Sequence, residues 1–261
     1  MEKILVFIPG YNCEKQITRV LNQFDNEVMS FISEIIFVNN CSTDCTEKIV
    51  LDYQKSHKNF PLKVLRNDAN YNLGGSHKIA FNYAIKNNFD YIIILHGDDQ
   101  GDIHDILPYL KTGEYEKYDC LLGSRFMKHS KLSGYSKFRI FGNNVFNFIY
   151  SVCIGKCIKD LGAGLNLYRV SILKNQFYHK FPDKLTFNCC MLFAHHYYKH
   201  VIRFFPITWR EDDQVSNVKM VRQSLVTLKI ALKYMFYKKS ILKDYRDVII
   251  DDYQAKEIES K

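Results

Sequence analysis

Residues 91–102, YIIILHGDDQGD, decide the fold prediction, because an apolar run passes directly into a polar cluster. The first five residues form a short continuous apolar run, which is typical of a fully buried strand in a parallel sheet. Asp98, Asp99 and Gln100 then fall at the carboxyl end of that strand, where open α/β sheets bind ligands. Their oxygen atoms suit a hard divalent ion that carries phosphates. The alternative interpretation is a solvated acidic turn.

Outward from this stretch, the first hundred residues alternate strand-like and helical segments four times. The earlier predicted strands are residues 3–8, 34–38 and 62–65, and the clearest predicted helices are residues 14–24 and 76–86. This alternation predicts a parallel, doubly wound α/β sheet. Right-handed crossovers would bring the intervening turns to one edge. The turns at 9–14, 39–44, 70–78 and 96–102 are rich in small polar groups, a composition suited to a nucleotide cleft.

Length and composition predict a globular protein. The chain has 261 residues, of which 47% are hydrophobic and 15% aromatic, enough to fill a real core. Its eight cysteines form no CxxC pair and the N-terminus has no signal-peptide pattern, so we expect free thiols in a reducing cytoplasm. No stretch approaches the ~18 uninterrupted apolar residues of a spanning helix. We expect a cytoplasmic protein, either free in the cytoplasm or bound to the cytoplasmic face of a membrane.

The C-terminal part of the sequence carries much of the net charge of +8. A helix is predicted at 216–239, and the overlapping region 219–243 holds seven basic side chains and no acid. The apolar stripe predicted for this helix is Val221, Leu225, Leu228, Leu232, Met235 and Phe236. A basic amphipathic helix indicates either a membrane-surface segment or a core-packing helix with a solvated basic face, and both remain open. We expect one domain over 1–210 and a helical extension over 211–261, and no nucleic-acid binding, since no known motif appears.

Six motifs, taken together, resemble the family 2 glycosyltransferases of GT-A fold, most nearly the dolichyl- or polyprenyl-phosphate sugar transferases. The motifs are IPGYNCEK at 8–15, VNNCSTD at 38–44, NLGGSHKIAFNYAI at 72–85, HGDDQGD at 96–102, GSRF at 123–126 and DLGAGLNLY at 160–168. The likeness covers roughly residues 3–210. It implies a mostly parallel sheet flanked by helices, and a metal-dependent, inverting transfer of sugar from a UDP- or GDP-linked donor.

The resemblance also implies which residues contact the donor. They are Pro9, Tyr11, Asn12, Glu14, Asn39, Asn40, Lys78, His96, Gly97 and Asp98. The second turn departs from the family's usual DDGS, since amides replace both acids, although amides still hydrogen-bond a base edge. The fourth-strand motif departs from DADGQ, since His96 stands for the first acid. The implied metal contacts are Asp98 and Gln100, with Asp99 or His96 in addition, and histidine favours Mn²⁺ over Mg²⁺.

The remaining implied roles concern the acceptor. Arg125 and Arg139 match two arginines that face phosphate groups, a task that suits guanidinium forks; surface salt bridges are the alternative. Asp160 matches an acid near the acceptor, which would deprotonate an acceptor hydroxyl or, with a phosphate acceptor, only position groups. The acids at 211–213 suggest either an acceptor-side lid or a solvated turn.

Several functions therefore remain in competition. The leading one transfers sugar to a polyprenyl phosphate or a growing surface glycan, as in bacterial-type polysaccharide synthesis. A nucleotidyltransferase is a second, although the first turn holds only one glycine. A degenerate nucleotide-sugar-binding module is a third, supported by the acids lost at Asn39, Asn40 and His96. The oligomeric state has no sequence signal.

Overall fold

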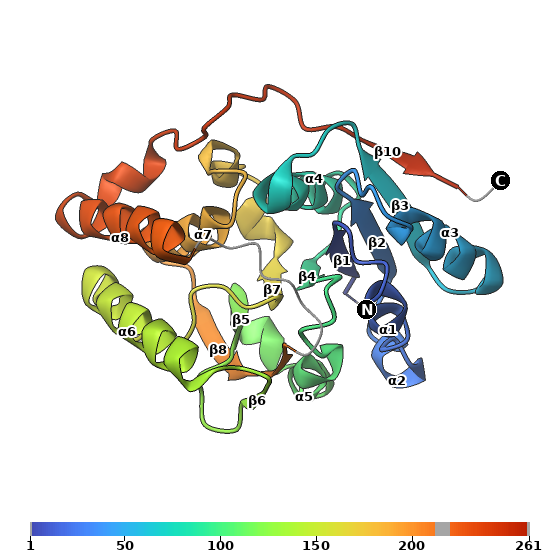
Figure 1. Ribbon diagram of the computed structural model, residues 1–261, viewed down its shortest axis with the longest axis horizontal. Helices are drawn as coiled ribbons and strands as arrows, with labels where there is room; N and C mark the ends of the chain where they lie inside the picture. Colours follow the sequence, from blue (N-terminus) through green and yellow to red (C-terminus); the bar gives the residue numbers. More distant parts are fainter. Residues whose placement is uncertain (1, 212–219, 260–261) are drawn as a thin grey trace.

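An eight-stranded, mostly parallel sheet runs through the molecule and carries helices on both faces (Figure 1). The computed structural model describes residues 2–211 and 220–259, so the acids at 212 and 213 lie outside the described residues. In spatial order the strands are β10 (Ala255–Ile258), β3 (Leu62–Asn67), β2 (Glu34–Asn39), β1 (Ile4–Gly10), β4 (Tyr91–Leu95), β7 (Leu165–Arg169), β5 (Cys120–Ser124) and β8 (Ile202–Pro206). A small second sheet pairs β6 (Lys131–Ser133) with β9 (Thr208–Arg210).

Strands β1 to β4 are parallel to one another, as the alternating pattern predicts. Strands β7 and β10 run antiparallel to theirs, which makes the sheet mixed at both sides of the parallel centre. The apolar run of β4 is buried along its whole length, because side chains on both faces of this central strand meet a core.

Two hydrophobic cores lie on opposite faces of the sheet, because successive side chains of a strand point to opposite sides. Leu5 and Phe7 of β1 enter one core, and Val6 and Ile8 enter the other. The helices are α1 (Ile17–Leu21), α2 (Asn26–Met29), α3 (Thr46–Ser56), α4 (Asn72–Lys86), α5 (Leu107–Lys111), α6 (Lys137–Ile154), α7 (Thr186–Tyr197) and α8 (Met220–Phe236). Helices α4, α6, α7 and α8 pack on the first core, and α1, α3 and α5 pack on the second.

Helix α4 begins four residues before the predicted start at 76. Gly74 and Gly75, which suggest a turn in the sequence, lie inside its first turn. A Cβ on Gly74 would stand 2.5 Å from the carbonyl oxygen of Pro182. Glycine is therefore present for a close backbone approach, and the helix continues through it.

Helix α8 corrects the predicted apolar stripe. Among the side chains described for 225–236, the buried ones are Ile230, Ala231 and Tyr234, which pack toward α6 and α7, whereas Leu225 and Phe236 are exposed. The side chain of Val221 lies outside the described part of the helix. After α8 the chain crosses back over the molecule, and β10 joins the sheet beside β3 (Figure 1). Within the described residues, no helix has the length and apolar character that crossing a bilayer requires.

Candidate active site

A cavity of about 1080 Å³ opens at the carboxyl ends of β1, β2 and β4. The predicted site residues that line it are Pro9, Tyr11, Asn40, His96, Gly97 and Asp98. The opposite wall comes from the segment before α7, from α8 and from the chain after it. Its polar residues are Lys184, Thr186, Lys229, Lys233, Tyr245 and Asp247. The cavity therefore joins segments that are more than 200 residues apart in the sequence.

The turns after β1 and β4 meet directly in this cavity, as the predicted crossovers require. The backbone N–H of Gly97 donates to the carbonyl oxygen of Pro9 at 3.1 Å. A Cβ at Gly97 would lie only 2.9 Å from that oxygen, so the contact depends on glycine. The two turns thus form one continuous floor beneath the ligand space.

Three predicted donor contacts instead build the walls of the cleft. The side chains of Asn12 and Glu14 accept hydrogen bonds from the backbone N–H groups of Thr43 and Cys45, at 2.8 and 2.9 Å. The amide of Asn39 is buried and donates to a carboxylate of α3 at 2.6 Å. Asn12 and Glu14 thus tie the first turn to the second, Asn39 ties the second turn to α3, and none of the three is among the residues that line the cavity.

Asn40, by contrast, lines the cavity at the centre of an amide network. Its Nδ2 donates to Asn70 Oδ1 at 2.8 Å, and its Oδ1 accepts from Asn67 Nδ2 at 2.9 Å and from the N–H of Tyr71 at 2.8 Å. A carboxylate cannot donate, so the first of these bonds requires an amide. The departure from the acidic family motif therefore agrees with the local hydrogen-bond pattern.

Asp98 is the acid that the fourth strand presents to the cavity. Burial raises the pKa of Asp98 to about 6, and the negative charges of Asp99 and Glu211 act in the same direction. The Nδ1 atom of His96 lies 4.0 Å from its Oδ2. Burial, assisted by the charge of Arg125, lowers the pKa of His96 to about 4, so this imidazole is neutral at pH 7.

The imidazole of His96 is held tightly against the backbone. A Cβ at Gly164 would lie 2.9 Å from Cγ of His96, so this position must be glycine for the ring to keep its place. The Nε2 atom of His96 is buried and has no hydrogen-bond partner within the described residues. A buried polar atom without a partner costs folding free energy unless a ligand bonds to it.

The other two predicted metal contacts, Asp99 and Gln100, have hydrogen-bond partners within the protein. The carboxylate of Asp99 accepts from Arg19 Nε at 2.6 Å, from Arg210 Nη2 at 2.8 Å and from Gln23 Nε2 at 3.1 Å. The amide of Gln100 donates to the carbonyl oxygen of Arg210 at 3.2 Å. Both side chains thus fix the loop to its surroundings. Across residues 2–211 and 220–259, no three His, Cys, Asp or Glu side chains gather in a way that could hold a metal ion alone.

The predicted acceptor residues are paired with acids. The guanidinium of Arg125 donates two hydrogen bonds of 2.8 Å to the Asp160 carboxylate, and the backbone N–H of Arg125 donates a third at 2.9 Å. The Asp160 side chain is only 1% exposed. Burial opposes the charge of Arg125, but Asp160 outweighs it and raises the pKa of the guanidinium. Arg139 forms an ion pair with Glu211. These pairs match the salt-bridge alternative, although the first is buried.

Lys78 is also engaged within the protein. Its side chain is fully buried, and Nζ donates to the carbonyl oxygen of Phe181 at 2.7 Å, to Asp183 at 2.7 Å and to the hydroxyl of Tyr253 at 2.9 Å. It therefore fixes the segment before α7 to the C-terminal chain that borders the cavity.

The lysines of the far wall are the functional candidates that sequence reasoning missed. Lys229 and Lys233 lie one helical turn apart on α8, and Lys184 forms an ion pair with Asp247. The acid-free basic run of α8 was the available signal. The sequence could not show that this run lies over the cavity. Apolar residues occur on more than one face of α8, so their spacing does not reveal which face packs on the core.

Comparison with known proteins supports the resemblance seen in the motifs. The sequence pattern of "Glycosyl transferase family 2" matches residues 5–177. An uncharacterised protein of Methanocaldococcus jannaschii is 27% identical over 173 residues, covering 66% of this chain and 67% of that protein. The dolichol-phosphate mannosyltransferase of Pyrococcus furiosus is 26% identical over 138 residues, covering 52% of this chain but 37% of the relative.

Solved structures of low sequence identity share the fold. TarS of S. aureus in complex with UDP-GlcNAc aligns with a TM-score of 0.59 and 17% identity, covering 93% of this chain and 70% of that one. Glucosyl-3-phosphoglycerate synthase from Mycobacterium tuberculosis, in complex with Mn²⁺, UDP-glucose and glycerol 3-phosphate, aligns with a TM-score of 0.58 and 12% identity. That alignment covers 88% of this chain and 80% of the synthase. The mixed sheet and its flanking helices are thus the GT-A arrangement.

Proposed function

Because the chain belongs to glycosyl transferase family 2 and is a glycosyltransferase, we propose that it moves a sugar from a UDP-linked donor to a lipid-linked phosphate, with a divalent ion. The observation that carries this proposal is that opposite charges line the two walls of one cavity. Asp98 lies on the sheet side, and Lys184, Lys229 and Lys233 lie on the other. UDP is preferred to GDP because the structurally similar TarS and the mycobacterial synthase were solved with UDP-sugars.

The lysines of the far wall favour an anionic ligand. A diphosphate entering between α8 and the sheet gains attraction from Lys229 and Lys233. The same diphosphate is repelled by Asp98 unless a cation lies between them, since like charges at short range are unfavourable. The cavity therefore favours a ligand that arrives with a divalent ion over a bare nucleotide.

The residues present fit such an ion only as part of a shared coordination shell. Mg²⁺ is usually held by one or two carboxylates together with waters and substrate phosphates, and Asp98 can supply the carboxylate. The buried Nε2 of His96 is a candidate nitrogen ligand, which Mn²⁺ tolerates better than Mg²⁺ does. When bound, the ion would neutralise the charge of the departing nucleoside diphosphate.

The acceptor class follows from the carboxylates of the cavity. Among the described lining residues these are Asp98 and Asp247, and Asp247 is paired with Lys184. Asp160 is enclosed by Arg125, so it suits positioning of the loop better than proton removal. A hydroxyl acceptor needs a base, whereas a phosphate oxygen is already ionised at neutral pH and attacks without one. Attack opposite the leaving diphosphate gives inversion at the anomeric carbon.

Two of the similar proteins also support a phosphate acceptor. The Pyrococcus relative is named for transfer to dolichol phosphate, and the mycobacterial synthase was crystallised with glycerol 3-phosphate. A growing surface glycan is the second candidate acceptor. A product that partitions into organic solvent and releases its sugar in mild acid distinguishes the lipid phosphate from the glycan.

The test is a panel of nucleotide sugars scored by thermal shift with and without Mn²⁺, followed by product analysis. A true donor raises the melting temperature by mass action, and we expect UDP-sugars to do so with Mn²⁺. Asp98→Ala should abolish the Mn²⁺-dependent part, while Asp52→Ala, which removes an exposed acid of α3, should not. Release of pyrophosphate instead of UDP would identify a nucleotidyltransferase. Donor binding without turnover would identify a binding module.

A further inference from the structure

Helix α6 presents an apolar face to solvent. Both of its ends are well defined: the Ser136 side chain caps the first turn, and Gly155, with φ of +75°, ends the last one. The exposed apolar residues recur at helical spacing and share one face. They are Phe138, Phe141, Val145, Phe148 and Val152, and the three phenylalanines are 68–78% exposed. The opposite face, with Tyr150 and Ile154, packs into the core.

Helix α8 lies beside α6 and repeats this arrangement (Figure 1). Leu225, Leu232 and Phe236 fall on one exposed face, and Phe236 is 83% exposed. That face is opposite Tyr234, which is fully buried against the core. Two adjacent helices therefore expose large apolar side chains at one end of the molecule. We call their combined exposed residues the α6–α8 face.

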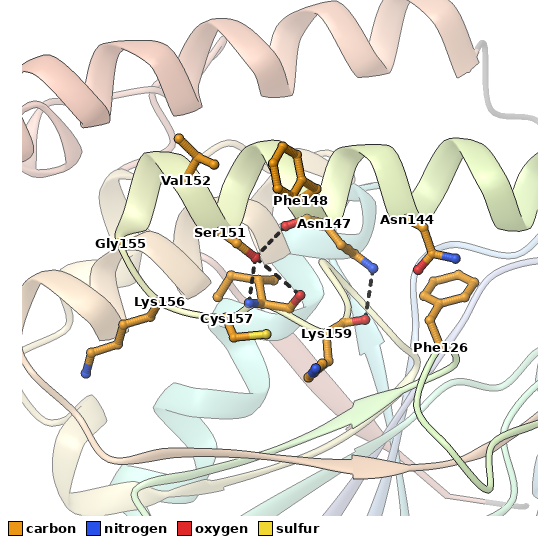
Figure 2. Close-up of a pocket in the computed structure, with 11 residues that line it drawn as sticks. Phe126, Asn144, Asn147, Phe148, Ser151, Val152, Gly155, Lys156, Cys157 and Lys159 are labelled. Atoms are coloured by element: carbon orange, nitrogen blue, oxygen red, sulfur yellow. Dashed lines mark hydrogen bonds between the residues drawn. The ribbon is translucent and has the colours of Figure 1, made fainter.

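Among the described residues, the surroundings of the α6–α8 face carry mostly positive charge, and the acid that contacts α6, Glu211, is paired with Arg139. Residues 121–159 and 219–243 contain no Asp or Glu. The exposed lysines near α6 are Lys128, Lys131, Lys137, Lys156 and Lys159. A hollow of about 530 Å³ lies along α6, and Figure 2 shows Phe148 and Val152 projecting on one side of it and the chains of Lys156 and Lys159 on the other.

We propose that the α6–α8 face docks onto an anionic membrane surface. Exposed phenylalanines beside lysines match the two parts of a bilayer interface, since the rings enter the acyl boundary and the ammonium groups meet anionic headgroups. A second copy of the chain is a poorer partner, because pairing two such faces sets lysines against lysines, and Glu211, the acid that contacts α6, is already paired with Arg139 and only 13% exposed. Charge complementarity thus selects the lipid surface.

This inference deepens the proposed function, on which its lipid acceptor rests. Helix α8 serves both surfaces: Lys229 and Lys233 line the cavity, while Leu232 and Phe236 face outward. Docking through α6 and α8 therefore sets the open cavity beside the bilayer. A polyprenyl phosphate can then present its headgroup to the cavity while its chain stays in the membrane.

The experiment is vesicle flotation of the full chain. We expect the protein to float with phosphatidylcholine vesicles that contain phosphatidylglycerol, to bind weakly to phosphatidylcholine alone, and to lose binding in high salt. The double variant Phe138→Ser/Phe148→Ser should weaken binding at least about tenfold. The matched control Val248→Ser/Ile249→Ser, which removes two exposed apolar side chains outside the α6–α8 face, should bind as the wild type does.

Lys156→Glu/Lys159→Glu separates charge from apolar insertion, since it should weaken binding and flatten the salt dependence. Melting temperatures of all variants should match the wild type, because every substituted side chain is exposed. Equal binding to neutral vesicles, or equal loss in the control, would overturn the proposal. A dimer in analytical ultracentrifugation that the phenylalanine variant dissociates would replace the membrane by a second copy. UDP-sugar thermal shifts without vesicles test the proposed function separately.

Discussion

Replacing Asp98 by asparagine should make the ligand-free protein more stable at pH 7.5 while it removes metal-dependent donor binding. The pKa of Asp98 rises from its ordinary 3.8 to about 6, which means that folding disfavours the ionised carboxylate. The asparagine amide would keep the oxygen that accepts the N–H of Gln100 at 3.2 Å, so the loop geometry can persist. The Asp98→Asn variant therefore removes a charge without removing that hydrogen bond.

The magnitude follows from the size of the pKa shift. A shift of about two units corresponds to roughly 3 kcal/mol at about 1.36 kcal/mol per unit. The side chain is 33% exposed, so solvent screening reduces the gain to about 1–2 kcal/mol. For a chain of this size that is a rise in melting temperature of roughly 2–8 °C.

The sign of the pH dependence is fixed by the same shift. A carboxylate whose folded pKa is raised adds stability that is full below pH 3.8 and is lost as the pH rises through about 6. The advantage of Asp98→Asn should therefore be largest at pH 7.5 and shrink toward pH 4. The assay is urea unfolding of both proteins in EDTA across this range. A variant that is less stable at pH 7.5, or a difference that does not change with pH, would refute this account of Asp98.

Three further substitutions test the surroundings of the cavity. Gly164→Ala should cost about 1–3 kcal/mol in urea unfolding, because its Cβ would meet the His96 ring at 2.9 Å, and a cost near zero would show that the ring is free to move. Arg125→Ala should lower the free energy of unfolding by about 3–5 kcal/mol in the same measurement, because it leaves Asp160 buried and charged. Unchanged stability with lost activity would instead give Arg125 a direct role in binding phosphate. Lys229→Ala should raise the donor KM by roughly tenfold, because a charge-assisted contact to the donor is lost. The melting temperature should not change, since the side chain is exposed. An unchanged KM would contradict the proposed role of the lysines that line the cavity.

The sequence alone predicted the parallel part of the sheet and one side of the cavity. Apolar runs as strong as that of β4 have few alternatives to a buried strand, and the order of strands and helices allows few topologies. The convergence of the turns after β1 and β4 followed from those crossovers. That convergence brings Pro9, His96 and Asp98 into one cleft.

Which polar side chains face the ligand space depends on long-range packing. Asp98 and Asp99 are adjacent and equally acidic, yet one lines the cavity and the other is held by two arginines, one of them 111 residues away. Arg125 and Asp160 were each expected to act on substrate, and the fold joins them to each other.

The far wall of the cavity was also decided by packing. The periodicity of α8 predicted an apolar stripe, but it could not say which of its several apolar residues would be buried. Tyr234 and Ile230 entered the core, so Lys229 and Lys233 turned toward the cavity and Phe236 toward solvent. Local sequence sets what each segment can form, whereas the partner of each side chain depends on segments that are distant in the chain, because burial and charge pairing are satisfied only when the whole chain has packed.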